Sequence, residues 1–294
     1  MWLVCLTAGG YAQLGCFVLA TCDHIFSQTR TIDLVVIHGQ KRRHVLKQFL
    51  ENTFRHQIKP FKAIQSARKL VSDPNDTTQV FQIIEALKGD SLARALTKLR
   101  STDAGRELLL RRPNIVRLLN DRVRLKSLPK GSVGRAYYDF VHRQNLSANE
   151  LIRSSRAAPQ YIGLSDEESW LASRLRDIHD LQHVMTGYGR DPVGELSLLS
   201  FMTTQTPNRG INFIIWVGKM KYRREVQEFD IRELIEEGAQ IARDAQWMPG
   251  ISWEKSLSEQ LADVRSELGF KPPLVYQRLR EEAPQLLLAR WTSK

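Results

Sequence analysis

Residues 165–196 restrict the possible folds of this chain more than any other stretch. Ser165 and Glu168 have the spacing of a capping box, in which two side chains satisfy backbone N–H groups at a helix start. Apolar residues then recur at helical spacing as far as about Gly187: Leu171, Leu175, Ile178, Leu181 and Met185, with Trp170 beside them. Asp191 and Pro192 are residue types that begin a helix. The stretch predicts one helix over residues 166–187, a short turn and a second helix.

Helix signals continue through the rest of the chain. Asp76 can cap a helix that Gly89 ends, and further helices are predicted over residues 90–99 and 103–112. Turn residues lie between helical segments rather than at short-strand spacing. With 42% hydrophobic and 26% charged residues, the composition is typical of a soluble globular protein. We predict an all-α fold: one multi-helix domain over residues 46–275, a peripheral extension over residues 1–45 and a tail over residues 276–294.

The first 22 residues contain no charged side chain and have nearly the length of a membrane span. Glycines and polar residues dilute this segment, and no Lys or Arg precedes it as in a signal peptide. Two interpretations stay open: a membrane-associated segment, or an extension that results from a misplaced start. The three cysteines, Cys5, Cys16 and Cys22, all fall here, so a disulfide framework is excluded and a reducing compartment is expected.

The net charge of +11 at pH 7 favours an anionic partner. Aromatic residues are not interleaved with basic ones as stacking platforms would be, so we expect an anionic membrane surface and no nucleic acid. Residues 211–224 have the composition of an interfacial helix, with six candidate membrane-facing or lipid-facing residues: Phe213, Ile214, Trp216, Val217, Lys219 and Lys221. A buried core helix that ends in solvent explains the same pattern.

His179 and His183 are four residues apart and therefore lie on one helix face, where both imidazoles can reach one metal ion. A tight turn would bring Glu195 back toward this face. Two histidines with carboxylates suit zinc or another divalent first-row metal. Asp180 has three alternative roles: a further ligand, a partner that orients an imidazole, or a water-activating base. A zinc peptidase is disfavoured, because Asp180 stands where the HExxH motif has its glutamate.

Three segments resemble the coenzyme Q (ubiquinone) biosynthesis protein four family. HDLQH, followed by eleven residues and Glu195, is similar to that family's HDxxH-x11-E signature. LPKGSVGRAYYDF, residues 128–140, and WEKSLSEQLADVRSELGF, residues 253–270, resemble two further family segments. Ser132 replaces a usual threonine, and Glu259-Gln260 replaces a usual proline. The resemblance covers about residues 60–275.

The resemblance implies an all-α fold and a metal ion bound by His179, Asp180, His183 and Glu195. It implies an enzyme of ubiquinone synthesis that acts on a polyprenylated hydroxybenzoate-derived lipid. The reaction would be an oxidative decarboxylation, in which a hydroxyl replaces the carboxyl at ring carbon 1. Zinc is the first expectation for the metal and iron the second. Arg135, in the matched segment, is a candidate partner for the substrate carboxylate.

The family is also described as a membrane-associated organiser of the other ubiquinone-biosynthesis enzymes. A non-catalytic, lipid-binding scaffold is therefore the alternative function, and a helical nucleic-acid-binding protein comes third. We expect a homodimer at a membrane surface. For a bacterial chain this surface is the cytoplasmic side of the inner membrane, and for a eukaryotic chain the matrix side of the mitochondrial inner membrane.

Overall fold

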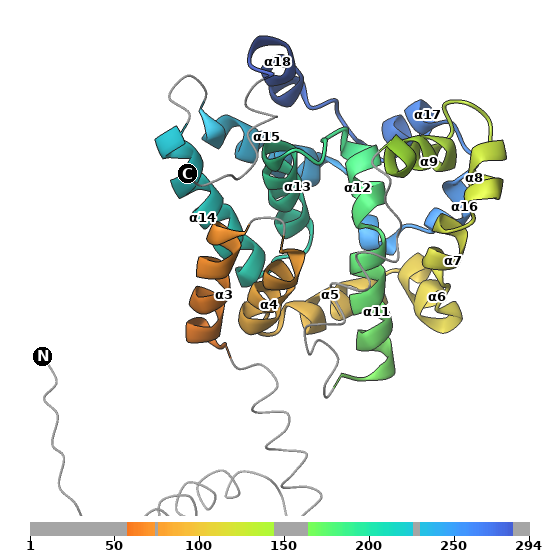
Figure 1. The fold of residues 1–294 in the computed structure, drawn as a ribbon. Coiled ribbons are helices and arrows are strands. Elements are labelled where there is room, and N and C mark those ends of the chain that lie inside the picture. Colours follow the sequence, from red (N-terminus) through yellow and green to blue (C-terminus); the bar gives the residue numbers. More distant parts are fainter. Residues whose placement is uncertain (1–57, 74–75, 144–163, 226–229, 285–294) are drawn as a thin grey trace, which may run out of the picture. The chain divides into compact units, whose positions relative to one another are not determined.

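The computed structural model describes residues 58–73, 76–143, 164–225 and 230–284 (Figure 1). The chain divides into two units, residues 1–50 and 51–294, and the described residues all belong to the second. The expected extension over residues 1–45, with its three cysteines, lies outside them. Among the described residues the β-type pairing is limited to one isolated antiparallel bridge, between Ser132 and Gln260. The predicted all-α fold is confirmed.

The described helices follow one another through short connections. In chain order they are α3 (Pro60–Ser72), α4 (Thr77–Leu87), α5 (Ser91–Arg100), α6 (Asp103–Arg111), α7 (Ile115–Leu119), α8 (Arg122–Ser127), α9 (Val133–Arg143), α11 (Asp166–Asp177), α12 (His179–Thr186), α13 (Pro192–Gln205), α14 (Arg209–Glu225), α15 (Ile231–Asp244), η1 (Met248–Gly250), α16 (Trp253–Ser256), α17 (Leu261–Glu267) and α18 (Leu274–Glu282). Asp76 caps α4 by accepting a hydrogen bond from the Thr78 N–H, as its sequence position predicts. The predicted helices over residues 90–99 and 103–112 correspond to α5 and α6.

The main hydrophobic core is centred on α13 and α15, which pack closely against each other. Leu198 and Phe201 of α13 are fully buried in it, as is Trp253 of α16. Gly238 of α15 permits the close approach, because a Cβ atom there would lie 2.3 Å from the carbonyl oxygen of Ser197. This pairing fixes α13, whose N-terminal turn carries Glu195.

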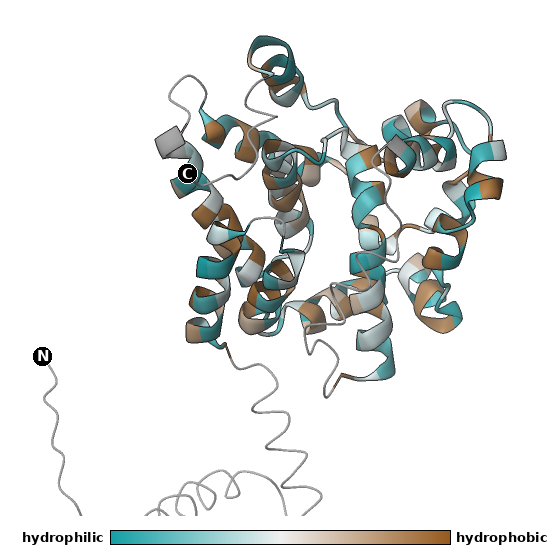
Figure 2. Ribbon diagram, in the orientation of Figure 1, coloured by the Kyte–Doolittle hydropathy of each residue, from teal (hydrophilic) through white to brown (hydrophobic). Residues whose placement is uncertain are grey.

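Helix α14 has one face in the core and one face in solvent. Ile211, Ile215 and Tyr222 are buried, whereas the Trp216 side chain is 56% exposed. Among the other expected membrane-facing residues, Lys219 is exposed, while Val217 and Lys221 are half-buried. Phe213 and Ile214 are also half-buried and pack against the core of α3 and α4. Figure 2 shows the hydrophobic positions along α14. No helix within the described ranges is long and apolar enough to cross a membrane.

The predicted helix over residues 166–187 is divided into α11 and α12 at Ile178. The capping box of Ser165 and Glu168 is present. Ile178 leaves helical geometry with φ −86° and ψ 3°. The two halves pack on different partners, α11 on α5 and α12 on α9. We attribute the break to these separate contacts, which the local apolar spacing does not encode.

Helix α18 crosses residue 275, where the domain was expected to end. Tyr276 and Leu279 are each 1% exposed and belong to the main core. Glu237 of α15 accepts hydrogen bonds from the N–H groups of Val275 and Tyr276, at the start of α18. The packed structure therefore extends to at least Ala283, which is also buried in the core.

Candidate metal centre

Three potential metal ligands lie on α12. One ligand atom from each of His179, Asp180 and His183 lies within 4.8 Å of the others. The two imidazole rings meet edge to face, with centroids 4.9 Å apart. This is the one-turn stacking that a spacing of four residues produces on a helix.

A tight turn brings Glu195 to the same place. Gly187 ends α12 with a left-handed φ of 84°, and Asp191 caps α13 by accepting a hydrogen bond from the Gly194 N–H. Gly194 lies so close to Gly189 that a Cβ atom on it would be 2.2 Å from the Gly189 carbonyl oxygen. The Glu195 carboxylate lies 3.4 Å from His183 Nε2 and 3.8 Å from His179 Nε2. The turn thus places a carboxylate opposite both imidazoles.

The surroundings of His183 direct its Nε2 atom toward a ligand. Its Nδ1 lies 3.1 Å from the Tyr188 carbonyl oxygen, a contact that assigns the proton of the neutral ring to Nδ1. Phe140 stacks on the ring at 5.2 Å. Within the described part of the chain, the buried Nε2 has no hydrogen-bond partner. A buried nitrogen lone pair without a donor is costly unless something else binds it, so this atom fits a metal ion.

His179 is oriented from its other side by Asp180. Its Nδ1 lies 3.2 Å from Asp180 Oδ1, so the neutral ring donates that hydrogen bond and leaves Nε2 facing Glu195. A carboxylate that holds the second nitrogen of a ligating imidazole is the usual outer contact of a histidine metal site. The geometry therefore places Nε2 of both rings and the Glu195 carboxylate around one point, with Asp180 behind His179.

Both carboxylates of the cluster are anionic at neutral pH. Burial opposes ionisation of Glu195, but its electrostatic interactions with His183 and His179 outweigh the burial and lower its pKa to about 2. Burial likewise opposes ionisation of Asp180, and the hydrogen bond to His179 is the largest influence that lowers its pKa. The pKa of His179 is raised, because the Asp180 hydrogen bond and the Glu195 charge outweigh its burial. Anionic oxygens beside imidazoles form a donor set that suits zinc.

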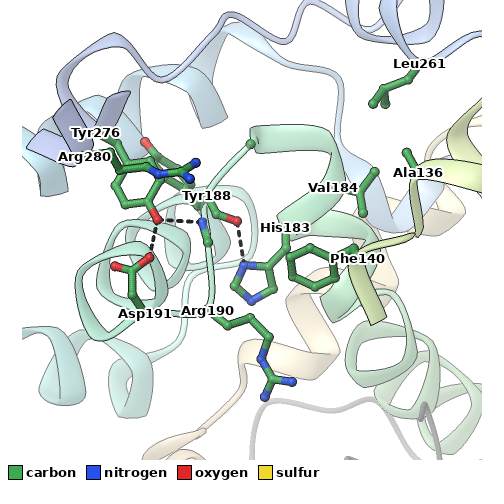
Figure 3. A pocket seen from close by; sticks show the side chains of 12 residues that line it. Ala136, Phe140, His183, Val184, Tyr188, Arg190, Asp191, Leu261, Tyr276 and Arg280 are labelled. Carbon is green, nitrogen blue, oxygen red and sulfur yellow. Dashed lines mark hydrogen bonds between the residues drawn. The ribbon is translucent and has the colours of Figure 1, made fainter. Parts of the chain in front are cut away.

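A cavity of about 680 Å³ opens beside His183 (Figure 3). Apolar atoms of Ala136, Phe140, Val184 and Leu261 line one part of it. The turn between α12 and α13 and the helix α18 line the rest, with Tyr188, Arg190, Asp191, Tyr276 and Arg280. The cavity can hold an apolar or aromatic molecule with a polar group directed toward the cluster.

The other sequence-derived candidate, Arg135, is engaged elsewhere. Its Nε donates to Asp139 at 3.1 Å and its Nη1 to the Lys126 carbonyl oxygen at 2.8 Å. It is not among the residues that line the cavity. The six candidate lipid-facing residues lie on α14, and none of them lines this cavity.

Sequence reasoning did not single out four residues that shape the site: Phe140, Tyr188, Arg190 and Tyr276. Tyr188 and Arg190 lie in the stretch that carries the ligand pattern, so their position beside it was an available signal. Tyr276 had no such signal, because it is 85 residues from Asp191, whose carboxylate accepts its hydroxyl hydrogen bond.

Most of the chain is similar to one known protein family. The family model described as "Coenzyme Q (ubiquinone) biosynthesis protein Coq4" matches residues 51–274. The chain is 30% identical over 180 residues to the mitochondrial ubiquinone biosynthesis protein COQ4 homolog of Rattus norvegicus, covering 60% of this chain and 64% of the rat protein. It is 29% identical to mitochondrial coq-4 of Neurospora crassa over 185 residues, covering 62% of this chain and 50% of the other. It thus spans less than two thirds of either relative.

A solved structure has the same fold. It is a crystal structure of a protein from Nostoc punctiforme PCC 73102 that is provisionally assigned to ubiquinone biosynthesis. The superposition has a TM-score of 0.54 and a sequence identity of 19%, and it covers 72% of this chain and 99% of the Nostoc chain.

Proposed function

Since the chain belongs to the coenzyme Q (ubiquinone) biosynthesis protein Coq4 family, we propose that it catalyses a metal-dependent step of that synthesis. The step is the oxidative decarboxylation of a polyprenylated hydroxybenzoate-derived precursor, with a hydroxyl replacing the carboxyl at ring carbon 1. One observation carries this proposal. Two imidazole nitrogens and a carboxylate converge at the edge of a cavity, and one of those nitrogens is buried without a hydrogen-bond partner in the described structure.

His179, His183 and Glu195 would hold the metal through Nε2, Nε2 and the carboxylate. Asp180 would hold His179 through Nδ1, although one of its oxygens lies within 4.8 Å of a ligand atom of each histidine, which also allows direct ligation. Zinc is the first choice for this donor set, and iron fits the two-histidine, one-carboxylate pattern as well. When bound, such an ion polarises an oxygen of the substrate or lowers the pKa of a water molecule.

The apolar residues of the cavity bind the substrate and exclude water. Phe140 and Val184 offer apolar surface to the ring and the first part of the prenyl chain. His183 is held from two sides, by Tyr188 and Phe140, so it needs no rearrangement during turnover. The reaction removes carbon dioxide and adds a hydroxyl, so it needs an external two-electron acceptor, for which dioxygen is the simplest choice.

The test uses cells that lack their own copy of the gene. Variants His183→Ala and Glu195→Ala should abolish quinone formation and accumulate a carboxylated prenyl intermediate, with protein levels unchanged. His142→Ala is the matched control, because His142 is exposed and stacks on Tyr138 rather than joining the cluster. Normal quinone levels in the two cluster variants would refute the catalytic role.

The alternative function is a lipid-binding scaffold that gathers the other ubiquinone-biosynthesis enzymes. The observation that favours it is an exposed surface that is both apolar and basic. Helices α3 and α14 contact each other, and Phe61 and Trp216 on them are exposed. Arg68 and Lys219 lie on the same two helices and Lys59 immediately precedes α3, and all three are exposed. For a scaffold, the cluster variants should lower folding and complex assembly together, with no defined intermediate.

The same surface supports a peripheral position on an anionic membrane, where a polyprenyl lipid is found. This position would be the cytoplasmic side of the inner membrane in a bacterium, or the matrix side of the mitochondrial inner membrane in a eukaryote. The two relatives compared above are both named as mitochondrial proteins. A homodimer is part of the same proposal, and sedimentation of the purified chain tests it.

A further inference from the structure

The turn between α12 and α13 presents one guanidinium group to the cavity. Arg190 lines the cavity, and its side chain is 26% exposed. Its Nε lies 3.5 Å from Glu195 Oε1, which is longer than a hydrogen bond. Nothing else in the described structure bonds to this guanidinium. A guanidinium has five N–H donors in a planar fork, so Arg190 has donors available for a ligand.

Hydrogen bonds hold the residues on both sides of Arg190 in place. The Gly189 N–H donates to the Tyr276 hydroxyl at 3.0 Å, and that hydroxyl donates to the Asp191 carboxylate. Asp191 in turn caps α13. Figure 3 shows the Arg190 side chain extending beside His183, whereas Arg280 lies next to Tyr276. Fixed neighbours reduce the cost of ordering an arginine around a ligand.

With a metal ion bound, positive charge would exceed negative charge around the cavity. A divalent ion would balance the carboxylates of Asp180 and Glu195. On the other side of the cavity, Arg280 lies over the Tyr276 ring, and that ring carries the hydroxyl bonded to Asp191. Arg190 forms an ion pair with Glu195 in the structure, and Glu195 would then be shared with the ion, so the Arg190 charge would be only partly balanced. A ligand with one negative charge and an apolar body matches this arrangement and the apolar wall of Phe140 and Val184.

We propose that Arg190 binds the carboxylate of the substrate and so distinguishes the acid that enters the cavity from the decarboxylated phenol that leaves it. The assignment depends on the proposed function for the identity of these two molecules. It gives Arg190 the role that the sequence suggested for Arg135, whose guanidinium already donates to Asp139 and to the Lys126 carbonyl oxygen. An arginine fork can contact both oxygens of a carboxylate, and a phenol without the carboxylate loses those contacts.

The experiment measures the binding of a matched pair of soluble probes to the zinc-loaded full chain. The probes are 3-prenyl-4-hydroxybenzoate and 2-prenylphenol, which differ only in the carboxylate. Calorimetry is carried out without oxygen, so that no turnover occurs. The wild type should bind the acid at least about tenfold more tightly than the phenol, as a charge-assisted hydrogen-bond pair provides. Arg190→Gln should reduce this ratio to about one, and Arg190→Lys should keep part of it.

Zinc content and thermal unfolding are measured for every variant, because Arg190 lies near Glu195. Arg280→Gln is the matched control, since it removes the other guanidinium of the cavity and should leave the ratio unchanged. The assignment is overturned if Arg190→Gln keeps the ratio, if Arg280→Gln abolishes it, or if the wild type has no preference. If Arg190→Gln does not fold, the other two variants decide the test. The assignment is then overturned if Arg190→Lys keeps the wild-type ratio or if Arg280→Gln abolishes the ratio.

The proposed function fails by a different result. A chain that binds neither zinc nor ferrous iron but still prefers the acid through Arg190 would refute the metal-dependent step and leave the anion site intact. A chain that binds zinc but shows no Arg190-dependent preference for the acid would refute the anion site and leave the metal-dependent step intact.

Discussion

At the scale of single residues, His179 and His183 face Glu195, whereas Asp180 lies behind His179. His183→Gln should remove a direct ligand and reduce zinc affinity the most. Asp180→Asn should reduce it by about 10- to 100-fold, the usual cost of losing a group that orients a ligating histidine. Competition with a chromophoric chelator measures both affinities. If Asp180→Asn were as damaging as His183→Gln, Asp180 would be a ligand itself.

The arrangement of the two histidines and Glu195 could be predicted from the sequence because it is local. His179 and His183 share a face through helix periodicity, and Asp191-Pro192 marks the helix that returns Glu195. Groups that complete the site from far along the chain could not be predicted this way. Glu254, for example, pairs with the buried Arg174 from 80 residues away, and this pair anchors the helix before the histidines.

At the scale of helices, the Glu237 carboxylate of α15, whose pKa is raised, holds the start of α18 through hydrogen bonds. Burial raises the pKa of Glu237 above its ordinary value, although it accepts hydrogen bonds from Val275, Tyr276 and Tyr188. A raised pKa in the folded state means that the stability from this group is present below its ordinary pKa of 4.5 and lost as the pH rises through the raised value. Glu237→Gln, which stays neutral, should therefore gain stability relative to the wild type between pH 5 and pH 7.5. Urea unfolding of both proteins at pH 5 and pH 7.5 measures this gain. A difference in the free energy of unfolding between variant and wild type that is the same at both pH values would contradict the prediction.

The contact between α13 and α15 provides a second prediction at this scale. Gly238→Ala would place a Cβ atom 2.3 Å from the Ser197 carbonyl oxygen, so the two helices would have to separate. We expect a loss of about 1–3 kcal/mol in the free energy of unfolding, typical of overpacking, despite the higher helix propensity of alanine. Chemical denaturation measures the loss, with exposed Glu236→Ala as the control. An unchanged or higher stability would show that the helices can separate without cost.

Helix boundaries were predictable where capping residues mark them and unpredictable where tertiary contacts decide them. Asp76, Ser165 and Asp191 all cap helices as their sequence positions indicate. The break at Ile178 has no capping side chain, and it separates two helices that pack on different neighbours. The inclusion of α18 in the core depends on Glu237 and Asp191, which are distant in sequence.

At the scale of the whole molecule, charge and exposed apolar residues predict binding to anionic vesicles. Phe61 is 87% exposed on α3 and Trp216 is 56% exposed on α14. The double variant Phe61→Ser/Trp216→Ser should weaken binding by about tenfold or more, because each side chain would bury a large apolar area in the bilayer. Co-sedimentation with vesicles containing an anionic lipid measures this, and high salt should weaken the binding of every form.

A second exposed apolar pair provides the control for this experiment. Leu110 and Val123, on α6 and α8, are 85% and 83% exposed and also have basic neighbours. Leu110→Ser/Val123→Ser should bind vesicles like the wild type. Equal weakening by both pairs would show that apolar exposure in general, and not the surface of α3 and α14, governs attachment. The sequence indicated the composition of α14, but the choice between core and surface depended on which of its sides the rest of the fold covers.

The short turn from Gly187 to Asp191 has a consequence for how such a protein can diverge. An extra residue in this turn would shift the start of α13, so the Glu195 carboxylate would no longer lie opposite both imidazoles. The side chains that line the cavity can be exchanged one at a time, which would alter the accepted molecule while the proposed cation pocket persists. New specificities in this architecture should therefore arise through substitutions around the turn, because a change in its length would dismantle the pocket in a single step.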